Sequence, residues 1–124
     1  MNMLPGVGAR VVSMNVGQTS LQDPLLREIT DRLVRAYSPQ RVYLFGSAAR
    51  GEAGPDSDYD ILLIVGDDAA PEILSSRRAY DVLWGLKAAA DVQIWQRREF
   101  DSRLHLKASL PATVIREGRL LYAA

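Results

Sequence analysis

Three short apolar runs set the strongest limit on how this chain folds. They cover residues 41–45, 59–65 and 91–95. Glycine directly follows the first two runs, and runs of this length suit buried strands. Segments with apolar residues at helical spacing lie between and around them. Strands that alternate with helices predict an α/β or α+β fold built on a small sheet.

Local signals predict where the helices begin and end. The pair Asp23-Pro24 suits the cap and first position of a helix, and Ser38-Pro39 would end it. Pro71 is expected to open a second, long helix with a continuous apolar stripe. Helical sequence then continues through about residue 117 with an interruption near Pro111, and residues 119–122 suit a short edge strand.

The connection between the first two runs is short and rich in glycine and proline. A parallel crossover usually needs about a dozen residues or more, mostly as helix. We therefore expect an antiparallel first pair within a small mixed β-sheet flanked by helices. A single domain over residues 21–124 is predicted, preceded by a poorly ordered segment over residues 1–20, which has no sustained periodicity.

Composition limits the chemistry that the chain can perform. Its 124 residues suit one domain, and its formal net charge of zero argues against a broad nucleic-acid footprint. With no cysteine and one histidine, it has neither a thiol nucleophile nor a multi-histidine metal site. Any metal chemistry must therefore use carboxylates. No apolar run reaches the roughly 20 residues of a membrane span, and no signal peptide is evident, so a cytoplasmic location is expected.

Acidic residues stand where the second and third runs begin. Asp58 and Asp60 are two residues apart, so strand alternation places both on one face, about 7 Å apart. Asp91 on a neighbouring strand would add a third oxygen donor, and Mg²⁺ prefers such ligands. A bound cation also removes the repulsion among the three. Asp91 has a simpler interpretation as the polar join between a helix and a strand.

A glycine and a serine follow the first run. Gly46 lets a phosphate approach the backbone closely, and Ser47 is predicted to begin a short helix whose amide and hydroxyl point at an anion. Arg50, one turn further on, would neutralise phosphate charge. Together these residues predict a triphosphate site beside the carboxylates.

This pattern resembles the nucleotidyltransferase superfamily that shares the catalytic core of beta-type DNA polymerases. The family pattern is Gly-Ser, a spacer, Asp-x-Asp, and a third acidic residue on a later strand. Here Gly46-Ser47, the spacer 48–57, Asp58-Tyr59-Asp60 and Asp91 follow that order. The chain looks like the minimal nucleotidyltransferases of prokaryotes over about residues 23–122, including the ending Glu117-Gly118-Arg119-Leu120-Leu121-Tyr122.

The resemblance implies a reaction. ATP would donate AMP to a hydroxyl, with two Mg²⁺ ions clamping the attacking and leaving oxygens. Asp58 and Asp60 would bridge both ions, and Asp91 would hold the ion near the acceptor. Removal of the acceptor's proton is a second role open to Asp91. Gly46, Ser47 and Arg50 would grip the phosphates.

The resemblance also implies a partner. The chain has no room for an acceptor-binding domain, and minimal nucleotidyltransferases act as antitoxins of HEPN-type ribonuclease toxins by adding AMP to a tyrosine. Two other functions stay open at this point. The chain could mask the toxin by binding alone, or it could modify a small molecule such as an antibiotic.

Several other conspicuous residues are expected to be structural. Trp84 and Trp95 are predicted to pack in the core, and Tyr59 to lie under the sheet, away from the carboxylates. His105 has no partner along the sequence and is expected at the surface. These residues are therefore left out of the predicted site.

Overall fold

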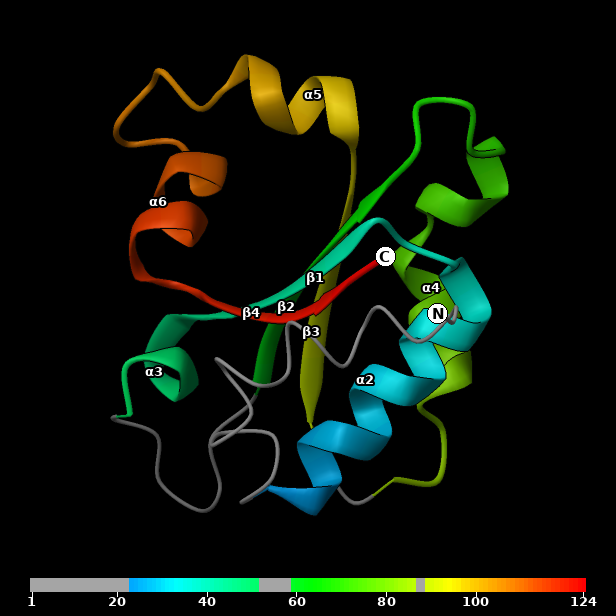
Figure 1. Ribbon diagram of the computed structural model, residues 1–124. Helices are drawn as coiled ribbons and strands as arrows, with labels where there is room; N and C mark the ends of the chain where they lie inside the picture. The colour runs from blue at the N-terminus through cyan, green and yellow to red at the C-terminus, as the bar shows by residue number, and fades with distance from the viewer. Residues whose placement is uncertain (1–22, 52–58, 87–88) are drawn as a thin grey trace, which may run out of the picture.

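The computed structural model describes residues 23–51, 59–86 and 89–124 (Figure 1). Residues 1–20, which are predicted to be poorly ordered, lie outside these ranges, and so does Asp58. The elements, in chain order, are α2 (Pro24–Tyr37), β1 (Arg41–Phe45), α3 (Gly46–Ala49), β2 (Tyr59–Val65), the 3₁₀ helix η1 (Pro71–Leu74), α4 (Ser76–Val82), β3 (Ala90–Gln96), α5 (Arg97–Ser102), α6 (Leu110–Glu117) and β4 (Arg119–Ala123).

Four strands form one mixed sheet in the order β3-β2-β1-β4. β1 runs antiparallel to both β2 and β4, and β2 runs parallel to β3. The predicted antiparallel first pair, the mixed sheet and the edge position of the last strand are therefore confirmed. The connection from β2 to β3 is long enough to hold η1 and α4, as a parallel crossover requires.

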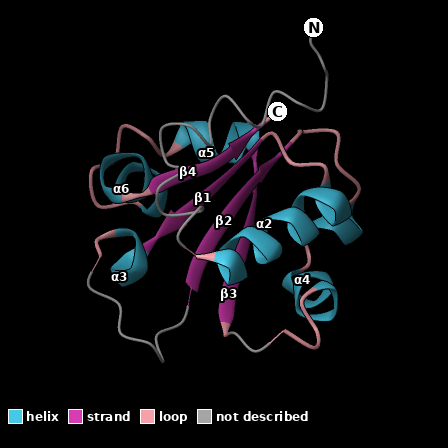
Figure 2. Cartoon of the chain, turned by 60° about the horizontal axis from the view of Figure 1, so that its bottom comes forward, coloured by secondary structure: helices cyan, strands magenta, loops and turns pink. Residues whose placement is uncertain are grey.

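Helices cover both faces of the sheet (Figure 2). On one face, α2 and α4 pack over the larger core cluster, which includes Ile61 and Leu63 of β2. On the other face, α5 and α6 cover a smaller cluster that includes Leu62 and Ile64. Because side chains alternate along a strand, Asp60 shares the face of Leu62 and Ile64.

The first helix follows its predicted boundaries. The Asp23 carboxylate accepts a hydrogen bond from the Leu26 N–H at 3.0 Å and so caps the helix. Ser38 ends it in the left-handed conformation at φ 47°, and its N–H donates to the Val34 carbonyl at 2.9 Å. Both ends of α2 are thus held by bonds within a single turn.

The long helix predicted from Pro71 is wrong. Ser75 adopts an extended conformation at ψ 126° and accepts a hydrogen bond from the Arg77 N–H at 3.2 Å, so it ends η1 and caps α4. The chain leaves the helix after Val82, and Trp84 is 73% exposed rather than part of the core. A serine that bonds to nearby backbone competes with a continuous helix.

The interruption predicted near Pro111 is present, but it lies before the proline. Pro111 lies in the first turn of α6, where proline lacks only an N–H that has no helical partner. The break instead covers residues 103–109, between α5 and α6. His105 lies in this break and is exposed, which confirms the expectation of a surface residue.

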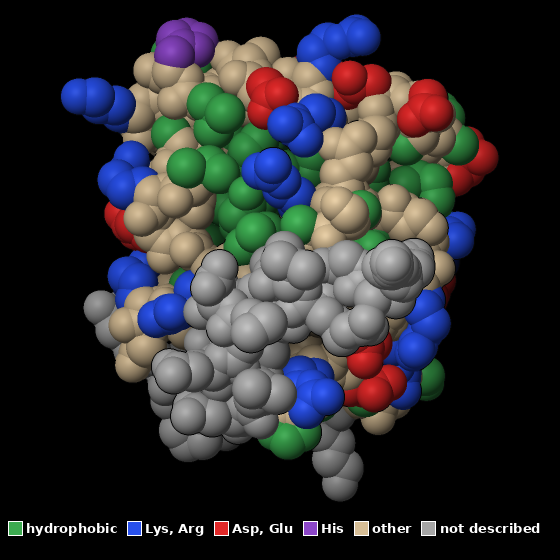
Figure 3. Space-filling model, in the orientation of Figure 1, with side chains coloured by type: hydrophobic (Ala, Val, Ile, Leu, Met, Phe, Trp, Pro, Cys, Tyr) green, Lys and Arg blue, Asp and Glu red, His purple; other side chains and the backbone are tan. Residues whose placement is uncertain are grey.

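The surface carries mixed charge. On the face drawn in Figure 3, positively and negatively charged side chains are interspersed, with hydrophobic side chains visible between α5 and α6. None of the helices in the described part of the chain is long and apolar enough to cross a membrane.

Candidate active site

The ends of three neighbouring strands meet at one edge of the sheet. Phe45, the last residue of β1, lies opposite Asp60, near the start of β2. Asp60 in turn lies beside Asp91, near the start of β3. The antiparallel first pair and the parallel second pair together produce this arrangement. Asp60 and Asp91 therefore come from neighbouring strands, and Gly46 directly follows the strand on the other side of Asp60, so the three strand ends predicted to form the site lie together.

Gly46 touches the Asp60 side chain more closely than any other residue type could. Its φ is +75°, and a Cβ added there would overlap Asp60 Oδ2 and lie 3.2 Å from Asp60 Cγ. Only glycine adopts this backbone conformation without strain and leaves room for the carboxylate. The glycine predicted to admit a phosphate thus also fits against the central acidic residue.

The short turn of helix predicted to begin at Ser47 is present as α3, but it begins one residue earlier, at Gly46. Ser47 is half-buried in α3, directly after Gly46. Arg50 follows as the C-terminal cap of α3. The Arg50 guanidinium lies 3.7 Å from Glu117 Oε1, and both side chains are about two-fifths exposed, at 43% and 40%. Arg50 is therefore tied to the end of α6, and its role toward a phosphate stays a prediction.

Arg119 is a positioning residue that our sequence reasoning missed. Its Nε donates to the Ala49 carbonyl at 2.7 Å and so holds the end of α3 from β4. Gly118, which directly precedes β4, lets the chain approach β1 closely, because a Cβ there would lie 2.9 Å from the Leu44 carbonyl oxygen. The signal was present in the Glu117-Gly118-Arg119 ending, which sequence analysis used only as a mark of resemblance.

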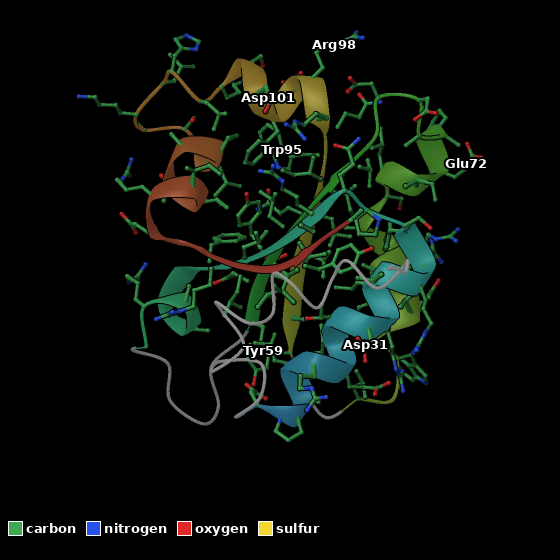
Figure 4. All side chains as sticks on the ribbon, in the orientation of Figure 1. Asp31, Tyr59, Glu72, Trp95, Arg98 and Asp101 are labelled. Atoms are coloured by element: carbon green, nitrogen blue, oxygen red, sulfur yellow. The ribbon has the colours of Figure 1, made fainter. Side chains whose placement is uncertain are left out.

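Tyr59 connects α2 to the end of the sheet that carries Asp60 and Asp91. Tyr59, which Figure 4 labels, packs against the larger core cluster, as expected. Its hydroxyl donates to the Asp23 carboxylate. Burial, together with the hydrogen bond and the charge of Asp23, raises the pKa of Tyr59 to about 12. One carboxylate therefore caps α2 and anchors the start of β2.

Trp95 lies on the other face of the sheet from Tyr59, beneath α5 (Figure 4). Its ring meets Phe100 edge-on at 6.4 Å between centroids, and Phe100 stacks on Tyr43 at 6.3 Å. The expected packing role of Trp95 is confirmed. This aromatic group holds α5 against the sheet, away from the end that carries Asp60 and Asp91.

The chemistry of the donor set fits a hard divalent cation. Asp60 and Asp91 offer carboxylate oxygens from adjacent strands on the same face of the sheet. Within the described ranges, no three metal-ligating side chains form a group. The predicted set includes Asp58, which lies outside those ranges, so the three-carboxylate metal site stays a prediction.

Comparison with known proteins identifies the family. Residues 26–116 match the family described as "Nucleotidyltransferase domain". Because this match covers most of the chain, the protein belongs to that family and is a nucleotidyltransferase. No curated protein matches the chain.

Solved structures share the fold. A candidate nucleotidyltransferase from Sulfolobus solfataricus is 19% identical with a TM-score of 0.55, covering 86% of this chain and 85% of that one. A toxin-antitoxin with AMP-PNP is 23% identical with a TM-score of 0.54, covering 78% and 73%. A mutant of the toxin-antitoxin MntA-HpeT is 19% identical with a TM-score of 0.50, covering 77% and 71%.

Proposed function

We propose that this protein is a Mg²⁺-dependent adenylyltransferase of the cytoplasm that moves AMP from ATP to a hydroxyl of a toxin protein. The acceptor in this proposal is a tyrosine of a HEPN-type ribonuclease, which makes the chain an antitoxin. One observation carries the proposal. Gly46 lies against Asp60, and Asp60 is the neighbour of Asp91 in the sheet, so the glycine proposed to admit a phosphate adjoins a pair of carboxylates.

Each residue has a defined task in this reaction. The N–H groups at Gly46 and Ser47 donate to the β- and γ-phosphate oxygens, with Arg50 adding positive charge. Asp58, Asp60 and Asp91 bind the metal, and Asp91 also accepts the proton of the attacking hydroxyl. Mg²⁺, when bound, neutralises charge on the attacking and leaving oxygens. The hydroxyl oxygen bonds to the α-phosphorus, the bond to the β-phosphate breaks, and pyrophosphate leaves.

Two features favour a protein acceptor. The formal net charge is zero and opposite charges are interspersed on the face in Figure 3, whereas nucleic-acid binding relies on an excess of Lys and Arg. Two of the similar structures carry toxin-antitoxin in their descriptions, which supports a toxin as the partner.

The test is intact-mass spectrometry of the proposed toxin, taken as the protein encoded by the gene next to this one, after incubation with this protein, ATP and Mg²⁺. We expect one or more AMP-sized additions, lost with Asp60→Asn. Asp31→Asn is the matched control, because Asp31 is an exposed aspartate on α2 (Figure 4). An unmodified product whose toxicity is still suppressed would instead favour an antitoxin that acts by binding alone.

Binding of ATP is measured separately by calorimetry. We expect affinity for ATP to fall when Mg²⁺ is withheld and when Asp58 and Asp60 are both replaced by alanine. Unchanged affinity in the double variant would contradict the proposed site.

A further inference from the structure

A cavity of about 810 Å³ opens between α4, the turn that follows it and the start of β3. Two aromatic side chains line it while remaining largely exposed, Tyr80 at 68% and Trp84 at 73%. Their ring centroids are 6.2 Å apart and the rings are tilted by 55°. Large aromatic groups left in water beside a cavity are typical of surfaces that bind a partner.

The cavity also reaches a strand edge with unused backbone groups. β3 is an edge strand, and Ala90 to Val92 line the cavity. The Tyr59 N–H donates to the Ala89 carbonyl at 2.9 Å, so the parallel ladder turns the backbone groups of Ala90 and Val92 away from β2. No other strand of the described chain pairs with this outer edge. An extended peptide is the ligand that such an edge recognises.

Charge and position narrow the choice of occupant. Arg77 of α4 lines the cavity, is exposed, and forms no ion pair within the described ranges. It would attract an acidic side chain. Asp91 also lines the cavity, on the opposite side of Asp60 from Gly46. Strand alternation turns the Asp91 side chain to the face away from α4. An occupant that pairs with the outer edge of β3 therefore passes beside Asp91 at that edge, on the side away from Gly46.

We propose that the cavity between α4 and β3 binds an extended, acidic segment of the partner protein that carries the acceptor hydroxyl. The segment adds to the outer edge of β3, contacts Tyr80 and Trp84 with an apolar side chain, and leads its hydroxyl toward Asp91. This inference rests on the proposed function and names the form in which its substrate binds. A nucleobase stacked on the same rings is the competing occupant.

Tryptophan fluorescence gives a direct measurement of binding. The chain has two tryptophans, so Trp95→Phe leaves Trp84 as the only one. The probes are peptides selected from a random library on the wild-type protein. We expect a selected peptide to shift the Trp84 emission to shorter wavelength and to protect it from acrylamide quenching. A shift produced by ATP, and not by any selected peptide, would overturn the proposal in favour of the nucleobase.

Variants of the exposed residues locate the binding surface. By calorimetry on the chain with both tryptophans, we expect Trp84→Ser and Arg77→Glu each to weaken peptide binding about tenfold or more, the size typical of central interface residues. Ile115→Ser is the matched control, an apolar residue on α6 that is 49% exposed. Equal peptide affinity in all three variants would place the binding surface elsewhere and refute the proposal.

Strand addition has a signature of its own. N-methylation of one peptide amide at a time removes one donor, so affinity should fall at every second position. A loss without this period of two would rule out pairing with β3. ATP binding measured on the same variants tests the proposed function separately. Intact ATP binding without peptide binding refutes only this inference. ATP binding is also measured on Asp60→Asn, and unchanged affinity in that variant contradicts the proposed function.

Discussion

Replacing Gly46 with alanine tests whether the close contact between α3 and Asp60 organises the active site. The new Cβ would overlap Asp60 Oδ2, at a residue whose φ is +75°. Left-handed backbone costs a non-glycine residue about 1–2 kcal/mol, and the alanine recovers about 0.4–1 kcal/mol by restricting the unfolded chain. Forcing the carboxylate aside adds about 1–3 kcal/mol. We therefore expect Gly46→Ala to lower the free energy of unfolding by about 2–4 kcal/mol.

Gly51→Ala separates backbone strain from the contact. Gly51 has nearly the same φ, +74°, but a Cβ there would meet nothing within 4 Å. Its substitution should therefore cost only about 1 kcal/mol, and urea unfolding followed by circular dichroism measures both values. AMP transfer should be lost in Gly46→Ala and kept in Gly51→Ala, because only the first displaces Asp60.

A double-mutant cycle completes the argument. In an Asp60→Ala background the overlapping oxygen is gone and the remaining Cβ lies 3.4 Å away, an ordinary contact. The additional cost of Gly46→Ala should then fall to that of Gly51→Ala, with a coupling energy of about 1–3 kcal/mol. Equal costs for Gly46→Ala in both backgrounds would refute the reasoning.

Three further predictions concern the elements around the site. Because burial and Asp23 raise the pKa of Tyr59 from its ordinary 10.0 to about 12, its contribution to stability is complete below pH 10 and is lost as pH rises toward 12. Tyr59→Phe should flatten the fall in unfolding free energy between pH 10 and 12. If this free energy falls with pH as steeply in Tyr59→Phe as in the Tyr80→Phe control, the assigned role of Tyr59 is wrong. Arg119→Met should lower the free energy of unfolding by about 1–3 kcal/mol in urea, since it removes a charged donor. The control Arg27→Met, on the exposed face of α2, should change it little, and equal losses in the two variants would contradict the positioning role of Arg119. Asp91→Asn should reduce kcat with little change in ATP affinity, and full activity would return it to a turn role.

Local structure could be predicted where the stabilising contacts lie close along the chain. The cap of α2 joins Asp23 to Leu26, and its end joins Ser38 to Val34, so both are visible in a short window of sequence. The second strand is likewise apolar at every position from Ile61 to Val65, because helices cover both faces of the sheet there.

Prediction failed where two local preferences compete. The apolar spacing after Pro71 favours one long helix, but Ser75 offers its hydroxyl to the Arg77 N–H and ends the first turn. Trp84 then lies beyond the end of α4, where its ring lines an open cavity instead of the core. Hydrophobic character alone does not say which surface a side chain covers.

The sequence by itself determined the candidate residues of the site, because Gly46, Asp60 and Asp91 each stand at the boundary of an apolar run. Only the tertiary structure decided the order in which those boundaries lie across the sheet. Strand order and register depend on how both sheet faces are packed, and they bring Asp60 between Phe45 and Asp91. The bond from Arg119 to the Ala49 carbonyl joins residues 70 positions apart. No local pattern encodes such a contact, because it forms only when β4 pairs with β1 and carries the arginine to the end of α3.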